Sequence, residues 1–200
     1  EAFNENEMMP IYQSSNNMVG LYCLYLHKAI LCYWFDQGEK ALEHIEIAAN
    51  YLMASTSQPT VPLFYLYDSL SRLSIYDAAS GSEQSCITSQ VEDNQRKLAF
   101  WAEHAPMNFQ HKHDLVLAEK CRCLSQKLEA IEAYDRAITG AKANGYIQEE
   151  ALAHELAAEF YLDWGKEKIA AVYMQDAYYC YARWGAKAKV ADLETRYRDL

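Results

Sequence analysis

The histidine and glutamate at positions 154 and 155 come closest to a known catalytic motif. They begin like the HExxH motif of zinc proteases, in which two histidines on one helical turn bind the metal and the glutamate acts as a base. Ala158 stands where the second histidine is required. A single histidine on that helical turn is not sufficient to bind zinc, so we interpret His154 and Glu155 as an ordinary surface pair.

Histidine and cysteine side chains also gather between residues 104 and 123, where zinc would need four converging ligands. The cysteines of the Cys-x-Cys pair would point roughly 200° apart on a helix, so they cannot both face one ion. The glycine nearest to a phosphate-binding loop, Gly81, lacks the lysine and the glycine spacing that such a loop requires. We therefore predict no catalytic residue, no metal ligand and no cofactor. The residues considered for zinc are His104, His111, His113, Cys121 and Cys123.

The segment 101–112 has the most unusual composition, with aromatic, histidine and lysine side chains around a proline. One interpretation is a packed corner, in which the proline ends one helix, the asparagine caps the next and two aromatic rings pack together. The other is a contact site for a partner domain, with the histidines and the lysine as its polar groups. The residues concerned are Trp101, His104, Pro106, Asn108, Phe109, His111 and Lys112.

Tyrosine is unusually frequent, with 16 residues, and offers apolar area together with one hydroxyl group. The run that includes Tyr173 and Tyr181 is expected to lie in the core on two faces. Tyr178 and Tyr179 are adjacent and point about 100° apart on a helix, so at least one of them can line an exposed groove. We add these two residues to the candidate interaction surface.

The charge balance limits the classes of partner. The formal net charge is −10 and the isoelectric point is near 5.0, which argues against nucleic acid and anionic membranes because both need a basic patch. No run reaches the ~18 apolar residues of a membrane span. Six cysteines without a bridging pattern are typical of free thiols in a reducing cytoplasm. The chain lacks an initiator methionine, and we read it as part of a longer polypeptide.

The apolar residues recur at helical spacing, and no stretch alternates with the two-residue period of a strand. We predict an all-α fold of about nine helices over residues 1–200, in a single domain with an irregular lead-in at 1–17 and an internal loop at 80–87. Thr88 or Ser89 is expected to cap the helix that follows this loop, and Ser89 with Glu92 fits a capping box. Gly165 and Gly185 fit left-handed helix ends. The helices are expected at 18–35, 39–54, 62–79, 89–104, 108–124 and 127–143, with three more in 151–200.

One pattern repeats in three of these helices: a small residue, a large residue four positions later and an alanine three after that. The last two copies stand 40 residues apart. This spacing is typical of the second helix in tetratricopeptide-type hairpins, whose usual repeat is ~34 residues. The copies are Ala41, Ile45 and Ala48; Ala130, Tyr134 and Ala137; and Ala170, Met174 and Ala177.

Several segments resemble the helical region of very large, chiefly cyanobacterial signalling proteins. Those proteins carry a serine/threonine-kinase-like domain, an AAA-type NTPase, a tetratricopeptide-like region, a GAF domain and a histidine kinase. The segments are Trp101–Glu119 (WAEHAPMNFQHKHDLVLAE), Tyr134–Ile138 (YDRAI), Glu149–Leu162 (EEALAHELAAEFYL) and Tyr178–Glu194 (YYCYARWGAKAKVADLE), with Ile30–Phe35 and Phe64–Leu70.

The resemblance implies a divergent tetratricopeptide-like array of antiparallel hairpins without catalysis of its own. Its expected role is to bind protein, either other domains of the parent chain or a signalling partner, and to relay signals between the NTPase or kinase parts and the histidine kinase. No catalytic motif of those parts lies in this chain. An alternative is a sensor, in which a tyrosine-rich concave face binds a small ligand or peptide and regulates an attached NTPase.

Overall fold

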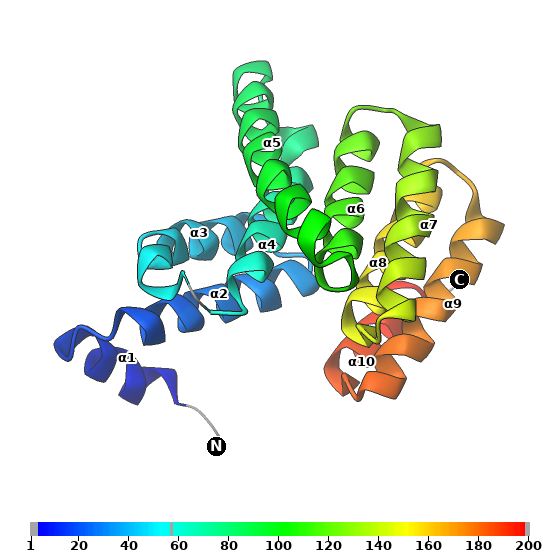
Figure 1. Ribbon diagram of the computed structural model, residues 1–200. Coiled ribbons are helices and arrows are strands. Elements are labelled where there is room, and N and C mark those ends of the chain that lie inside the picture. The colour runs from blue at the N-terminus through cyan, green and yellow to red at the C-terminus, as the bar shows by residue number, and fades with distance from the viewer. Residues whose placement is uncertain (1–3, 57, 199–200) are drawn as a thin grey trace. The chain divides into compact units, whose positions relative to one another are not determined.

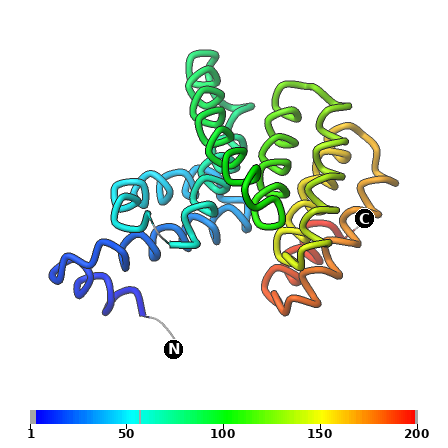
Figure 2. The backbone as a smooth tube through the Cα atoms, viewed as in Figure 1, coloured from blue at the N-terminus to red at the C-terminus, as the bar shows by residue number. Residues whose placement is uncertain are grey.

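The chain is helical throughout the computed structural model, which describes residues 4–56 and 58–198. Within these ranges it forms ten α-helices and two short 3-10 helices, and no strand. Figures 1 and 2 show how the helices fold back on one another as sequential antiparallel pairs. The predicted all-α array of helix pairs is therefore confirmed. None of the described helices is both long and apolar enough to cross a bilayer.

The first compact unit spans Glu1–Ile75, and its helix α2 contacts each of the other three α-helices of the unit. Tyr22 and Leu26 of α2 are fully buried, as are Leu66 and Leu70 of α4. Together with the fully buried Ala41, Ile45 and Ala48 of α3, these side chains form the core of the unit. The elements are α1 (Glu5–Ser14), α2 (Met18–Trp34), α3 (Gly38–Ala49), the 3-10 helix η1 (Leu52–Ser55) and α4 (Val61–Ser74).

The second compact unit spans Tyr76–Leu200. From α5 onward, each helix contacts the helix that follows it. Helix α8 is the most enclosed, since every residue of 149–158 is buried. The elements are the 3-10 helix η2 (Tyr76–Ala78), α5 (Gly81–His104), α6 (Pro106–Cys123), α7 (Lys127–Ala143), α8 (Ile147–Asp163), α9 (Glu167–Trp184) and α10 (Lys187–Arg196). The range predicted as one domain thus contains two compact units.

Six turns in the described part of the chain, two in the first unit and four in the second, share one geometry. Each contains a residue in the left-handed conformation, and the next backbone N–H donates to a carbonyl five residues earlier at 2.8–3.0 Å. This bond satisfies a carbonyl that the helix end would leave unpaired. Glycine adopts this conformation most readily, and asparagine and aspartate follow. The left-handed residues recur every 20 positions: Asn16 and Asp36 in the first unit, and Ser125, Gly145, Gly165 and Gly185 in the second.

The repeated pattern lies in helices α3, α7 and α9, which we call the second helices. In each of them the fourth residue is the small one, and the large residue and the second alanine follow one and two turns later. All nine side chains are between 0% and 5% exposed. The spacing therefore marks the buried face of each second helix, where alanine allows close approach of the neighbouring backbone.

The lead-in predicted as irregular is corrected by helix α1. Asn4 caps it by accepting a hydrogen bond from the backbone N–H of Asn6, and Glu5 pairs with Lys28 of α2 at 2.6 Å. Apolar residues do not recur clearly at helical spacing in this segment, because no residue of α1 is fully buried and Pro10 lies within the helix. The helix was therefore not expected. Residues 1–3 of the predicted lead-in lie outside the described residues.

The loop predicted at 80–87 is wrong, because α5 begins at Gly81. The motif of a serine followed three residues later by glutamate occurs twice here, and the earlier copy forms the cap. The backbone N–H of Ser80 donates to Oε2 of Glu83 at 2.8 Å. Ser89 and Glu92, which were expected to form the capping box, lie inside the helix.

Candidate functional site

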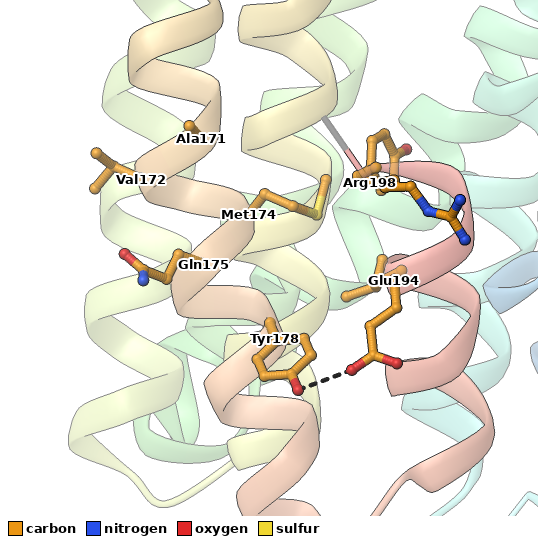
Figure 3. A pocket seen from close by; sticks show the side chains of 9 residues that line it. Ala171, Val172, Met174, Gln175, Tyr178, Glu194 and Arg198 are labelled. Atoms are coloured by element: carbon orange, nitrogen blue, oxygen red, sulfur yellow. Dashed lines mark hydrogen bonds between the residues drawn. The ribbon is translucent and has the colours of Figure 1, made fainter. Parts of the chain in front are cut away.

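An open groove of about 430 Å³ lies between α9 and α10 in the second unit (Figure 3). Met174 and Tyr178 line it from α9, while Glu194 and Arg198 line it from α10 and the residues just after it. Figure 3 shows Met174 and Tyr178 pointing toward α10. The size falls within the range of protein ligand sites, about 300–1,000 Å³.

The groove has an apolar floor and a polar edge. Met174 is 5% exposed and forms part of the floor, whereas Val172 is 59% exposed at the rim. The hydroxyl of Tyr178 donates to Oε1 of Glu194 at 3.0 Å, and this hydrogen bond raises the pKa of the tyrosine. Arg198 is exposed and contributes a positive charge to the lining. This combination suits an amphipathic peptide or helix better than a wholly polar ligand.

Buried charged groups hold α10 against the rest of the unit. Glu155 of α8 is 3% exposed and accepts from Nζ of Lys189 at 2.7 Å and from Nη2 of Arg196 at 2.9 Å. The hydroxyl of Tyr181, from α9, donates to the other carboxylate oxygen at 2.8 Å. Lys189 itself is 2% exposed. The second wall of the groove is thus fixed by ion pairs, together with the buried side chain of Leu193.

A second polar contact lies at the end of α10. The hydroxyl of Tyr197 donates to Oε1 of Glu159 at 2.6 Å, and its ring lies against the guanidinium of Arg196 at 5.0 Å. Desolvation and the nearby Glu155 raise the pKa of Glu159, while Tyr197 and Arg196 act in the opposite direction. Tyr197 therefore serves both the groove and the attachment of α10.

The segment 101–112 forms the corner between α5 and α6. Trp101 and Phe109 lie with ring centroids 5.9 Å apart, and Pro106 is the first residue of α6. The cap of α6 is Ala105, so the expected capping role of Asn108 is wrong. Asn108 lies within α6 and accepts a hydrogen bond from the hydroxyl of Tyr146 at 2.8 Å.

Two residues of the predicted interaction surface, His111 and Lys112, lie inside the unit. They are 2% and 4% exposed, and both contact the buried carboxylate of Glu149 on α8. The Nζ of Lys112 also lies 4.2 Å from the ring centroid of Tyr146. Burial disfavours the charged form of Glu149, but the hydrogen bonds from His111 and Lys112 outweigh it and lower the pKa of the carboxyl. The two residues thus join α6 to α8 and offer no polar group to a partner.

The remaining predicted surface residues are distributed over different places. His104 is exposed at the end of α5, where its Nδ1 lies 2.8 Å from the carbonyl of Phe100, and Trp101 is half-buried. Tyr178 lines the groove. Tyr179 is 56% exposed outside the groove lining, with its ring centroid 5.9 Å from that of Tyr178. Of the predicted set, only Tyr178 contributes to the groove.

The pair interpreted as a surface feature, His154 and Glu155, is buried at 8% and 3% exposure. The interpretation is wrong because tertiary partners cover both residues: the ring of His154 lies 5.9 Å from that of Tyr173, and Glu155 binds Lys189. Burial lowers the pKa of His154. Sequence reasoning missed these roles because a glutamate at helical spacing reads as solvent-facing until its partner, here 34 residues away, is known.

The candidate metal ligands and the six cysteines lie in the described part of the chain. No group of three or more histidine, cysteine, aspartate or glutamate residues in the described part of the chain is arranged to hold a metal ion. Burial raises the pKa of the Cys123 thiol to about 12 and that of Cys180 to about 11. These two cysteines are therefore neutral thiols near pH 7, and the thiolate is the reactive form.

Comparison of the chain with protein-family models, with curated proteins and with solved structures found no match.

Proposed function

We propose that this chain is a non-catalytic module for protein interaction and signal relay within a large cytoplasmic signalling kinase. The observation that carries the proposal is the groove between α9 and α10, which offers an apolar floor, a tyrosine and an arginine to a partner. The sequence resemblance to multidomain kinases and the repeated second-helix face support the same assignment. The parent protein would contain the kinase and NTPase activities.

The relay would use the contacts between alternate helices. Lys112 of α6 binds Glu149 of α8 at 2.8 Å, and Glu155 of α8 binds Lys189 of α10 at 2.7 Å. Both pairs are buried. If one helix shifted without its partner helix, the ion pair between them would separate and a buried charge would be left without a counter-ion, which is costly. Small displacements at α10 would therefore be passed to α8 and α6 as rigid-body shifts of packed helices.

Co-elution of separately produced domains tests the proposal. The chain is mixed with the kinase-like, NTPase, GAF and histidine-kinase domains of a signalling protein of the resembling class, and each mixture is examined by size-exclusion chromatography. We expect one of them to co-elute with the chain, and the Tyr178→Ala substitution to weaken that complex. Tyr179→Ala is the matched control, because Tyr179 is exposed but does not line the groove. Absence of any complex would contradict the proposal.

A second candidate function is a sensor that binds a small ligand or peptide in the same groove. The volume of about 430 Å³ and the hydroxyl of Tyr178 at its edge favour this candidate. A thermal-shift screen against metabolites and nucleotides distinguishes the two functions. Stabilisation that is lost in Tyr178→Ala would favour the sensor, whereas no stabilisation together with a domain complex would favour the relay.

A further inference from the structure

The groove has a structural counterpart one repeat earlier in the same unit. The left-handed residues Gly145 and Gly185 end α7 and α9 at equivalent positions, 40 residues apart. Helices α7 and α8 therefore correspond to α9 and α10, and each groove residue has an equivalent 40 positions before it. The pairs that matter are Ile138 and Tyr178, His154 and Glu194, Ala157 and Tyr197, and Ala158 and Arg198.

In the earlier repeat this surface is covered, and helix α9 covers it. Tyr173 of α9 donates its hydroxyl to Asp135 of α7 at 2.9 Å. The ring of Tyr173 also lies against two residues of α8, 5.3 Å from Tyr161 and 5.9 Å from His154. Tyr173 is thus the anchor that places a second helix over the pair α7 and α8.

Four residues of the α7–α8 surface are also more buried than their equivalents at the α9–α10 groove. Ile138, His154, Ala157 and Ala158 are all buried, between 0% and 9% exposed. Their equivalents at the groove are half-buried or exposed: Tyr178, Glu194, Tyr197 and Arg198. The groove is therefore the position that a further second helix would occupy.

We infer that the α9–α10 groove binds an amphipathic partner helix of the second-helix type, with an acidic first turn and small residues on its inner face. This inference rests on the proposed interaction function and names the chemistry of the partner. Each second helix of this chain has a glutamate in its first turn, namely Glu39, Glu129 and Glu167. In the pair α8–α9 the first turn of α9 follows the end of α8 at Asp163, five residues and about 7.5 Å along the axis after Ala158, so the long side chain of Arg198 would extend toward the first turn of the partner.

The residues that differ between the two sites define the specificity. Tyr197 and Arg198 are larger than their equivalents Ala157 and Ala158, so a helix can approach only if it presents alanine or glycine to them. An aromatic residue at the position of Tyr173 would meet Gln175 and Glu194, the equivalents of Asp135 and His154. Helix-in-groove recognition of this kind uses anchors spaced by three and four residues.

A peptide with the sequence of α9, Glu167–Trp184, is the probe. It is labelled with fluorescein and titrated with the 200-residue chain, and binding is followed by anisotropy. We expect saturable binding that Tyr178→Asp weakens at least tenfold, because the new carboxylate lies in the groove at the position equivalent to Ile138, which is buried in the earlier repeat. Tyr179→Asp is the matched control, since Tyr179 is a 56% exposed tyrosine of the same helix that does not line the groove. It should change the affinity less than twofold.

A charge exchange tests the orientation of the partner. Arg198→Glu should weaken binding of the peptide several-fold, and a peptide carrying lysine in place of Glu167 should recover most of the loss. Equal affinity of the Tyr178→Asp and Tyr179→Asp chains, or no recovery in the charge exchange, would overturn the inference.

The remaining outcomes separate this inference from the proposed function. Concentration-dependent dimers that Tyr178→Asp abolishes, measured by sedimentation velocity, would overturn a partner helix in favour of a second copy of the chain. A signalling domain that co-elutes with the chain while the α9 peptide fails to bind would overturn the inference and leave the interaction function standing. Binding of the peptide without any domain complex would support the helix site and contradict the proposed parent.

Discussion

Replacing Glu155 by glutamine should destabilise the second unit strongly, because this carboxylate is the centre of the contacts that hold α10. Glutamine has almost the same shape but no charge, so Lys189 would stay 2% exposed without its closest counter-ion. Removing one partner of a buried ion pair costs about 3–5 kcal/mol. Asp192 lies 3.2 Å from Nζ of Lys189 and offsets part of this cost, so we expect about 3 kcal/mol.

The assay is urea unfolding followed by circular dichroism, with hydrogen exchange of the α10 amides as a local measure. The matched control is Glu194→Gln, an exposed glutamate of α10, which should cost less than about 0.5 kcal/mol. The double substitution Glu155→Leu with Lys189→Met removes both charges and should recover most of the stability. If Glu155→Gln cost no more than the control, the ion pairs would not be what holds α10.

Three further substitutions test other features of the second unit. The lowered pKa of Glu149 stabilises the fold above the unfolded value of 4.5 and ceases to do so as the pH falls, so unfolding free energies measured from pH 6 to pH 3 should fall less steeply in Glu149→Gln. Gly165→Ala should cost about 1–2 kcal/mol in urea unfolding because its φ is 73°, whereas Gly81→Ala, with open space around the added carbon, should be nearly neutral. Ala157→Leu should cost about 1–3 kcal/mol by overpacking a side chain that is 0% exposed, and Ala191→Leu on the exposed face of α10 should not.

The helical spacing of apolar residues and the positions of glycines at helix ends were sufficient to predict most of the helices. The helix predicted at 127–143 agrees with α7 at both ends, and Gly165 and Gly185 were expected at left-handed positions. Ser125 was not, because serine gives no comparable signal for that conformation. The 20-residue rhythm becomes visible only when residues of different types are seen to share one backbone geometry.

The groove was only partly predictable, for a physical reason. The spacing of Tyr178 and Tyr179 indicated that one of them could be exposed, but not that Glu194 would receive the hydroxyl of the first. Buried charges were the harder case. Lys112 and Glu149 are 37 residues apart in the sequence. The residues adjacent to either one therefore do not indicate that its charge is paired with the other.

The equal spacing of the left-handed turns constrains how the length of this chain can change. One residue inserted into a helix rotates everything after it by about 100° and advances it by about 1.5 Å, which would turn the alanine face away from its neighbour. The rhythm is interrupted between Asp36 and Ser125, which are 89 positions apart, a distance that is no multiple of 20. Insertions and deletions should therefore be tolerated in the connections before and after α4, where the described residues include no left-handed turn that sets the spacing, and be excluded from α6 through α10.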